Sequence, residues 1–448
     1  MPWNRERVDY VRNIARKGPT EVGYAYFRAR RRRANLADDE TTLTESDELA
    51  ISGAFDYTRE QMTAHRAVVD AYAAMETCEI RSIQWFLPYF AHAYFGGVYT
   101  ILRFADHLAE QHGVESRFCL YDARPDEPTI SRLAKQIHEA FPRLATAEVT
   151  GSKVDGHEQF GHLQDADAAI STLWTGAYPL LRFNRVRAKF YFVQDYEPQF
   201  YPAGAGSGLV EETYRFGIPG IVNTPGLAAA YREYGNRAVS FVPAVDTRYQ
   251  PPSTPRPTDG PVKIFFYGRP GTPRNGFGLG LATLKKVKDR FGDRVEIVAA
   301  GEAWREGAFG MAGVLTNLGR LPGLDAVSDL YRTCDIGLVF MFTKHPSYQP
   351  LEFMASGMAT VSNENPDTAW FLRHEENSLV APPAASIIAD EIGRLVEDAD
   401  VRRRIADEGQ REMAALSWPG QFDRIWQTIT HPAGSTWGDP EAWRVPAG

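Results

Sequence analysis

The sequence has few cysteines, no long apolar run and no excess of basic residues. Its three cysteines, Cys78, Cys119 and Cys334, lie far apart without metal-ligand spacing, so we expect neither a disulfide framework nor a zinc site. No apolar run approaches the ~20 residues of a membrane-spanning helix, and the N-terminus lacks the apolar core of a signal peptide. A net charge of −8 argues against nucleic-acid binding. These absences predict a soluble protein of the reducing cytoplasm.

Several catalytic motifs are also missing. The sequence contains no G-x-S-x-G, no H-E-x-x-H and no Walker lysine motif, and its ten histidines show no ligand clustering. The hydrophobic content of 44% over 448 residues is that of a globular protein with two or three buried cores.

Two successive runs of alternating strand and helix patterns occupy most of the chain. The first covers residues 76–245, and the second covers 262–430, beginning with the strand VKIFFYG and ending in helices. The proline-rich stretch 246–261 between them is typical of a linker. The pattern predicts an α/β protein of two doubly wound, Rossmann-like domains. Such sheets bind ligands at the carboxyl ends of their strands, so we expect the domains to face a cleft.

The two ends of the chain differ from these runs. Residues 1–75 are charged and helix-compatible, and 431–448 form a tail. The segment 24–33, YAYFRARRRR, combines aromatic residues with arginines. Two interpretations stay open: peripheral contact with an anionic membrane surface, or an ordinary solvated helix face.

Candidate phosphate-binding groups follow two predicted strands. Arg269 and Arg274 lie in the glycine- and proline-rich loop GRPGTPRNGFGLG, where arginine forks can grip a diphosphate or stay solvated. Gly96 and Gly97 lie between a strand and its helix, where glycine permits close approach of a phosphate or a tight turn.

Polar residues at two other strand ends are candidate substrate contacts. Gln194, Asp195 and Glu197 follow the strand FYFV, and the alternative is a turn stabilised by the aspartate. Glu302, downstream of Gly280, has the place of a ribose-binding acid in a dinucleotide fold, although GFGLG departs from G-x-G-x-x-G. A dinucleotide-dependent oxidoreductase therefore remains an alternative.

The stretch TKHPSYQPLEFMASGMATVSNENP (343–366) places Glu352 at the start of a small-residue helix. The acid either complements the helix dipole or meets the hydroxyls of a ligand whose phosphates lie near that helix end.

Together these pieces resemble the retaining GT-B glycosyltransferases of family 4, over residues 80–430. The loop YGRPGTPRNG resembles the family's GR-x(4)-K loop with Arg274 in place of lysine, and HPSYQPLEFMASGMATVSN resembles its E-x(7)-E segment. Gly96-Gly97 resembles its N-domain glycine loop. Within the family, YFVQDYEPQFYP and HPSYQPLE look most like bacterial rhamnosyltransferases of surface-layer glycan assembly, which use dTDP-β-L-rhamnose and carry a helical N-terminal extension.

The resemblance implies a role for each matching residue. Glu352 would bind the ribose or deoxyribose hydroxyls, and Arg269 and Arg274 would hold the diphosphate and stabilise its charge as it leaves. The remaining donor-binding positions are Tyr348, Pro350, Leu351, Gly96 and Gly97. Two departures from the pattern stand out: Lys344 replaces the first glutamate of E-x(7)-E, and Gln194 replaces a histidine, which leaves Asp195 and Glu197 as alternative polar contacts.

The expected reaction is transfer of a hexose, L-rhamnose, from a nucleotide-diphosphate sugar to a hydroxyl of a lipid-linked glycan acceptor, with retention. The sequence has no D-x-D motif where a metal-dependent transferase needs one, so the expectation is that the arginines do the work of the cation and that no metal cofactor is required. A sugar-nucleotide-binding protein of the same fold without turnover is the other alternative.

Overall fold

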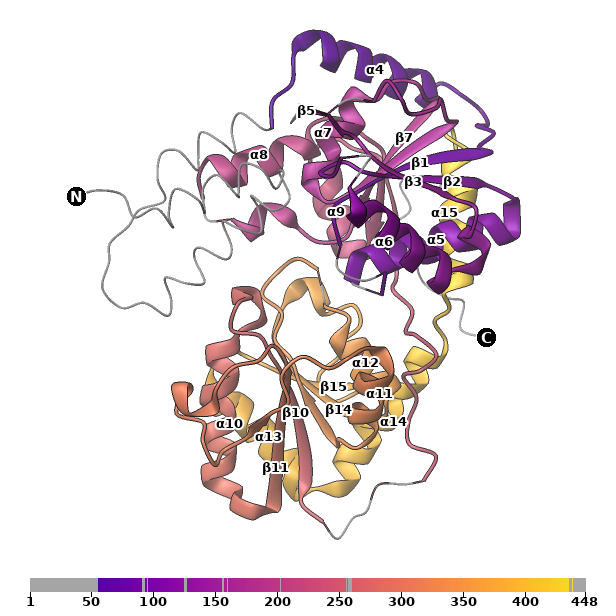
Figure 1. Cartoon of the computed structure of the whole chain (residues 1–448). Helices are drawn as coiled ribbons and strands as arrows, with labels where there is room; N and C mark the ends of the chain where they lie inside the picture. Colours follow the sequence, from indigo (N-terminus) through magenta and orange to yellow (C-terminus); the bar gives the residue numbers. More distant parts are fainter. Residues whose placement is uncertain are drawn as a thin grey trace, which may run out of the picture. The chain divides into compact units, whose positions relative to one another are not determined.

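The computed structural model forms two compact units (Figure 1). The first runs to Phe241 and takes up Pro419–Arg444, and the second contains Val242–Trp418. The arginine cluster at 24–33 lies outside the described residues. Among the helices that the structure describes, none has the length and hydropathy of a membrane-spanning segment. The structure describes residues 55–437 apart from gaps at 91–92, 95, 125–126, 155–156, 159, 202, 255, 257–259, 346 and 435–436.

The first unit is built on a parallel sheet in the order β3-β2-β1-β6-β7-β8-β9. The strand order reverses between β1 and β6, so right-handed crossovers place helices on both faces. The strands are nearly continuous apolar runs, as a sheet covered on both faces requires. Their bounds are β1 Ser82–Leu87, β2 Glu115–Leu120, β3 Glu148–Gly151, β6 Ala168–Thr172, β7 Ala188–Val193, β8 Gly220–Asn223 and β9 Ala238–Phe241, with a small antiparallel pair, β4 Lys153–Val154 and β5 His157–Glu158.

The helices of the first unit begin at recognisable signals. Thr58 and Gln61 form a capping box at the start of α4, and proline occupies the first turn of α6 and α9. The helices are α4 Arg59–Ala73, α5 Gly96–His112, α6 Pro128–Ala140, α7 Trp174–Arg182, α8 Ala205–Tyr214, α9 Pro225–Arg232 and α15 Trp418–Ile429.

The second unit repeats this architecture with the order β12-β11-β10-β13-β14-β15. Its strand order reverses between β10 and β13, and α10 and α13 pack together in its core cluster. The strands are β10 Val262–Gly268, β11 Val295–Gly301, β12 Thr316–Asn317, β13 Ile336–Leu338, β14 Ala359–Asn363 and β15 Ser378–Ala381. The helices are α10 Phe277–Phe291, α11 Leu324–Arg332, α12 Gln349–Ala355, α13 Ala385–Glu397 and α14 Ala399–Ala414. The prediction of two doubly wound α/β domains is confirmed.

Two segments pack differently from the predicted domain spans. The described part of 246–261 is held on the second unit, because Tyr249 is buried and Arg256 donates hydrogen bonds to the carbonyls of Ser356 and Gly357. The last helix, α15, was expected with the second domain but belongs to the first unit, where its Phe422 ring packs against Phe104 of α5. The hydrophobic periodicity of α15 predicts an apolar face but does not identify the unit against which this face packs.

A buried polar contact joins α4 to β7. Lys189 of β7 has no exposed surface, and its Nζ donates to the Leu181 carbonyl at 3.0 Å and to Asn184 Oδ1 at 2.7 Å. Its third neighbour is His65 Nδ1, 3.2 Å away, while His65 Nε2 lies 3.0 Å from the Phe216 carbonyl. These contacts assign the proton of His65 to Nε2 and leave Nδ1 to accept from the lysine. Burial lowers the pKa of Lys189 to about 7 and, with Lys189, that of His65 to about 3.

Candidate active site

In the second unit, the candidate residues follow β10 and β13, where the strand order reverses. The loop after β10 carries Arg269, whose Nη1 donates to the Tyr267 hydroxyl at 3.3 Å. Glu302, at the end of β11, lies 3.8 Å from the Arg269 guanidinium and accepts the Gly271 N–H at 3.2 Å. Glu302 therefore shapes the arginine loop, and this role accounts for an acid at that strand end without a dinucleotide ribose.

The Arg274 segment lies directly against the loop that follows β13. Phe342 N–H donates to the Arg274 carbonyl at 3.3 Å. Gly276, with φ of +60°, allows the two loops to approach this closely. A Cβ at this position would lie 2.9 Å or less from atoms of Phe340 and Phe342. His345 is buried on the same loop, and burial together with the charge of Arg274 lowers its pKa to about 3. His345 is therefore neutral and adds no positive charge beside Arg274.

Two asparagines fix the loop after β13 from the neighbouring strand end. Asn363 Oδ1 accepts the Met341 N–H at 2.7 Å, and Asn365 Nδ2 donates to the Thr343 carbonyl at 2.8 Å. Thr343 in turn donates its hydroxyl to the His345 carbonyl at 2.7 Å. These supports were not predicted from the sequence, although the run SNENP at the end of a buried strand was a usable signal.

The helix α12 begins where the sequence predicted. Tyr348 caps it, Pro350 and Leu351 are buried in its first turn, and Glu352 is the acid of that turn. Glu352 is half-buried and bonds to the Tyr249 hydroxyl. Burial first, and then this carboxylate, raise the pKa of Tyr249. The bond to Tyr249 thus orients the carboxylate of Glu352 at the start of α12.

In the first unit, Gly96 and Gly97 begin α5 after β1. A Cβ on Gly97 would lie 2.6 Å from Gln194 Nε2, so a larger residue there would displace the glutamine amide. Gln194 Nε2 donates to the Gly97 carbonyl and to Thr172 Oγ1, both at 3.0 Å. The glutamine therefore ties together the carboxyl ends of β1, β6 and β7, where the strand order reverses. Its Oε1 is buried and has no hydrogen-bond partner among the described residues.

The two acids after β7 have different roles. Asp195 is half-buried, and its Oδ1 accepts the Tyr196 N–H at 2.8 Å, as in an aspartate-stabilised turn. Glu197 is buried and accepts from the Trp174 N–H at the start of α7 and from the Tyr191 hydroxyl. The expectation that Glu197 is a polar substrate contact is therefore wrong, because its carboxylate satisfies a helix N-terminus inside the core.

Each of the ten predicted residues lies at the carboxyl edge of the sheet of its own unit. Gly96, Gly97, Gln194 and Asp195 belong to the first unit, and Arg269, Arg274, Tyr348, Pro350, Leu351 and Glu352 belong to the second. Within the second unit, backbone contact joins the loops after β10 and β13 and so places the arginine loop beside the segment that leads into α12. This edge is where parallel sheets bind phosphate-containing ligands.

Known proteins match both units. Residues 87–224 match the model of the WsaF N-terminal domain, and residues 262–393 match that of the WsaF C-terminal domain. The O-antigen biosynthesis protein RfbC of Myxococcus xanthus is 41% identical over 391 residues, which are 85% of this chain. The chain spans 30% of that protein's length.

Solved structures share the architecture at low identity. Sucrose-phosphate synthase of Thermosynechococcus elongatus superimposes with a TM-score of 0.58 at 13% identity, over 78% of this chain and 98% of that one. HepE of Anabaena, in complex with UDP and glucose, gives a TM-score of 0.58 at 14% identity, over 78% and 99%. The chain therefore matches the models of both WsaF domains, in order along the sequence, and has the GT-B glycosyltransferase fold.

Proposed function

We propose that this protein is a retaining glycosyltransferase of polysaccharide or O-antigen assembly that transfers a hexose, L-rhamnose, from a nucleotide-diphosphate donor to a hydroxyl of a lipid-linked glycan. The observation that carries the proposal is the contact between the Arg274 loop and the loop leading into α12. It supports a single donor site, with two arginines for a diphosphate and Glu352 for the sugar of the nucleoside. The similarity to RfbC supports the place in O-antigen assembly.

The arginine loop supplies the electrostatics of the proposed reaction. Charge grows on the diphosphate as the glycosidic bond breaks, and guanidinium groups held at fixed positions stabilise that charge more than the ground state. Glu302 holds Arg269 and the Gly271 backbone before any ligand arrives, so little reorganisation is needed. In the proposal the arginines do the work of a cation, and no metal takes part in transfer.

In the first unit, Gln194 occupies the position where a general base was expected. Gln194 has no titrating proton, and its amide is already bound to Gly97 and Thr172. We therefore infer that the departing diphosphate accepts the proton of the acceptor hydroxyl on the same face of the sugar. Gln194 is a positioning residue in this scheme, because it fixes the start of α5.

Calorimetry and a transfer assay test the donor assignment. We expect dTDP to bind more tightly than UDP or GDP, and dTDP-L-rhamnose to be consumed in the presence of an acceptor glycan. Tenfold tighter binding of GDP, a difference of about 1.4 kcal/mol, would contradict the rhamnose assignment and leave the transferase proposal standing. Binding of nucleotide sugars without transfer or hydrolysis of any of them would instead favour the non-catalytic alternative.

The proposal also includes peripheral contact of the segment 24–33 with anionic membranes. Co-sedimentation with anionic liposomes should fall as salt rises, because attraction between exposed charges is screened within about 8 Å at physiological ionic strength. Neutralising Arg30 to Arg33 should release the protein without changing turnover on a soluble acceptor. If sedimentation is the same in that variant, the segment is an ordinary solvated one.

A further inference from the structure

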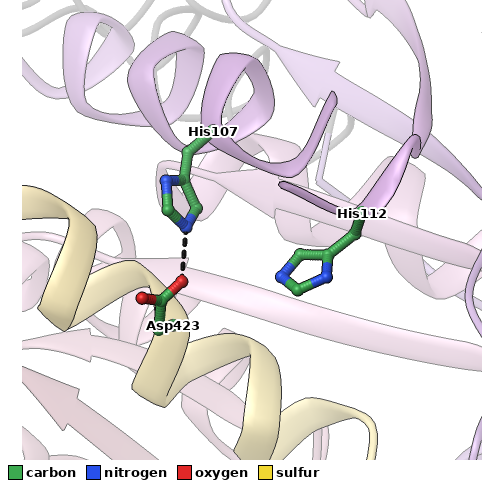
Figure 2. A group of neighbouring side chains, drawn as sticks. All are labelled: His107, His112 and Asp423. Carbon is green, nitrogen blue, oxygen red and sulfur yellow. Dashed lines mark hydrogen bonds and ion pairs between the residues drawn. The ribbon is translucent and has the colours of Figure 1, made fainter. Parts of the chain in front are cut away.

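Two histidines and an aspartate meet at the other edge of the first sheet. His107 and His112 lie on α5, and Asp423 lies on α15 (Figure 2). His107 Nε2 is 2.7 Å from Asp423 Oδ1, and one ligand atom from each of the three residues lies within 4.8 Å of the others. The His107 side chain is 8% exposed and Asp423 is 60% exposed, so the group has a buried side and a side open to solvent.

The cluster is separate from the candidate active site. The helix α5 begins at Gly96 on the carboxyl edge of the sheet and ends at His112, about 24 Å away along its axis at 1.5 Å per residue. The cluster therefore lies near the C-terminal end of α5. The helix macrodipole makes that end partly negative, which favours a bound cation.

The surroundings position His112 and leave an entry path. Its ring stacks on Trp426 of α15, with centroids 4.6 Å apart and an interplanar angle of 18°. A hollow of about 560 Å³ adjoins them and is lined in part by His112, Trp426 and His431. Solvent therefore reaches His112 from this hollow and Asp423 from its exposed side.

We propose that His107, His112 and Asp423 bind a divalent transition-metal ion of the Zn²⁺ type. Imidazole nitrogens and a carboxylate oxygen are its preferred ligands at about 2.0–2.2 Å, so tetrahedral ligand atoms lie roughly 3.3–3.6 Å apart. The three ligand atoms lie within 4.8 Å of one another, with those of His107 and Asp423 2.7 Å apart, so binding requires the exposed His112 and Asp423 side chains to adjust to that spacing. The ion replaces the proton between His107 and Asp423, and water from the hollow completes the coordination.

The proposed ion has a structural consequence. His107 and Asp423 are 316 positions apart in the sequence, and the chain passes through the whole second unit between them. A metal bound to both α5 and α15 ties the returning helix to the first unit. Metal binding is then coupled to the docking of α15, because the ligands come together only in the folded state.

The test is titration of the metal-stripped, full-length protein with ZnCl₂. We expect one site per chain by calorimetry, and at least a tenfold weaker affinity in both His112→Ala and Asp423→Asn. Both positions are exposed, so these variants should fold, and their melting temperatures without metal check this. Zinc should raise the melting temperature of the wild type by a few degrees at saturation and leave that of His112→Ala unchanged.

A histidine in the second unit supplies the matched control. His374 is exposed and is not part of the cluster, so His374→Ala should bind zinc as the wild type does. Three outcomes would overturn the proposal: no saturable binding by the wild type, equal affinity in His112→Ala, or an equal loss in His374→Ala. A contact between His107 and Asp423 with no metal role predicts a lower melting temperature in Asp423→Asn and no response to zinc in any variant.

Discussion

Arg274→Ala should lower turnover about 10²–10³-fold and weaken donor binding much less. The proposed role of Arg274 is to meet charge that appears on the diphosphate only as the bond breaks, so its loss costs roughly 3–4 kcal/mol in the transition state. The structure favours a specific effect over unfolding, because the half-buried Arg274 holds the next loop through its backbone carbonyl, which alanine keeps. Steady-state kinetics with varied donor measures both quantities.

Two further variants separate the diphosphate from the nucleoside. Arg274→Lys should recover much of the lost turnover, because lysine keeps the charge. Glu352→Gln should raise the apparent KM for the donor before it changes kcat. Tyr249→Phe is the control for that variant, since it removes the hydroxyl that bonds to Glu352 and leaves the carboxylate in place. Normal turnover and normal donor affinity in Arg274→Ala would show that the arginine does not contact the diphosphate.

The strands and the loops that follow them could be predicted because their signals are local. The run VKIFFYG is β10 residue for residue, and the acid predicted in a first turn lies in the first turn of α12. A short run rich in aromatic and branched apolar residues and bounded by glycine favours a buried parallel strand over a helix. Strand ends in parallel sheets gather at one edge, so the candidate residues could be placed without knowing any contact.

What could not be predicted depends on partners that are distant in the sequence. Glu197 looks like a free acid at a strand end, and only the fold brings the N-terminus of α7 onto it. The histidines showed no clustering because His107 and His112 are five apart rather than four, and Asp423 lies far along the chain. The position of α15 has the same cause, since an apolar helix face does not specify which unit it will cover.

The buried Lys189 offers the second large effect, a rise in the stability of the first unit with pH. Its pKa is about 7 in the fold, compared with an ordinary value of 10.5. Between these two values the unfolded chain holds a proton that the folded chain has released, so the free energy of unfolding increases with pH. The increase is at most about 1.4 kcal/mol per pH unit, and about 2–3 kcal/mol between pH 6.5 and 9. This added stability is lost again as the pH falls toward 7, where the folded state also binds the proton.

Urea unfolding of the wild type and of Lys189→Met at several pH values measures this contribution. Between pH 6.5 and 9 the free energy of unfolding of the wild type should rise by about 2–3 kcal/mol relative to that of Lys189→Met. Measurement should stop near pH 9, because the buried Cys78 and Cys334 have raised pKa values and oppose the trend above it. Lys286→Met, at an exposed position of α10, should run parallel to the wild type. A constant difference for Lys189→Met would mean that Lys189 stays protonated in the fold across this range, and that His65 and Asn184 then hold an ammonium ion inside the first unit.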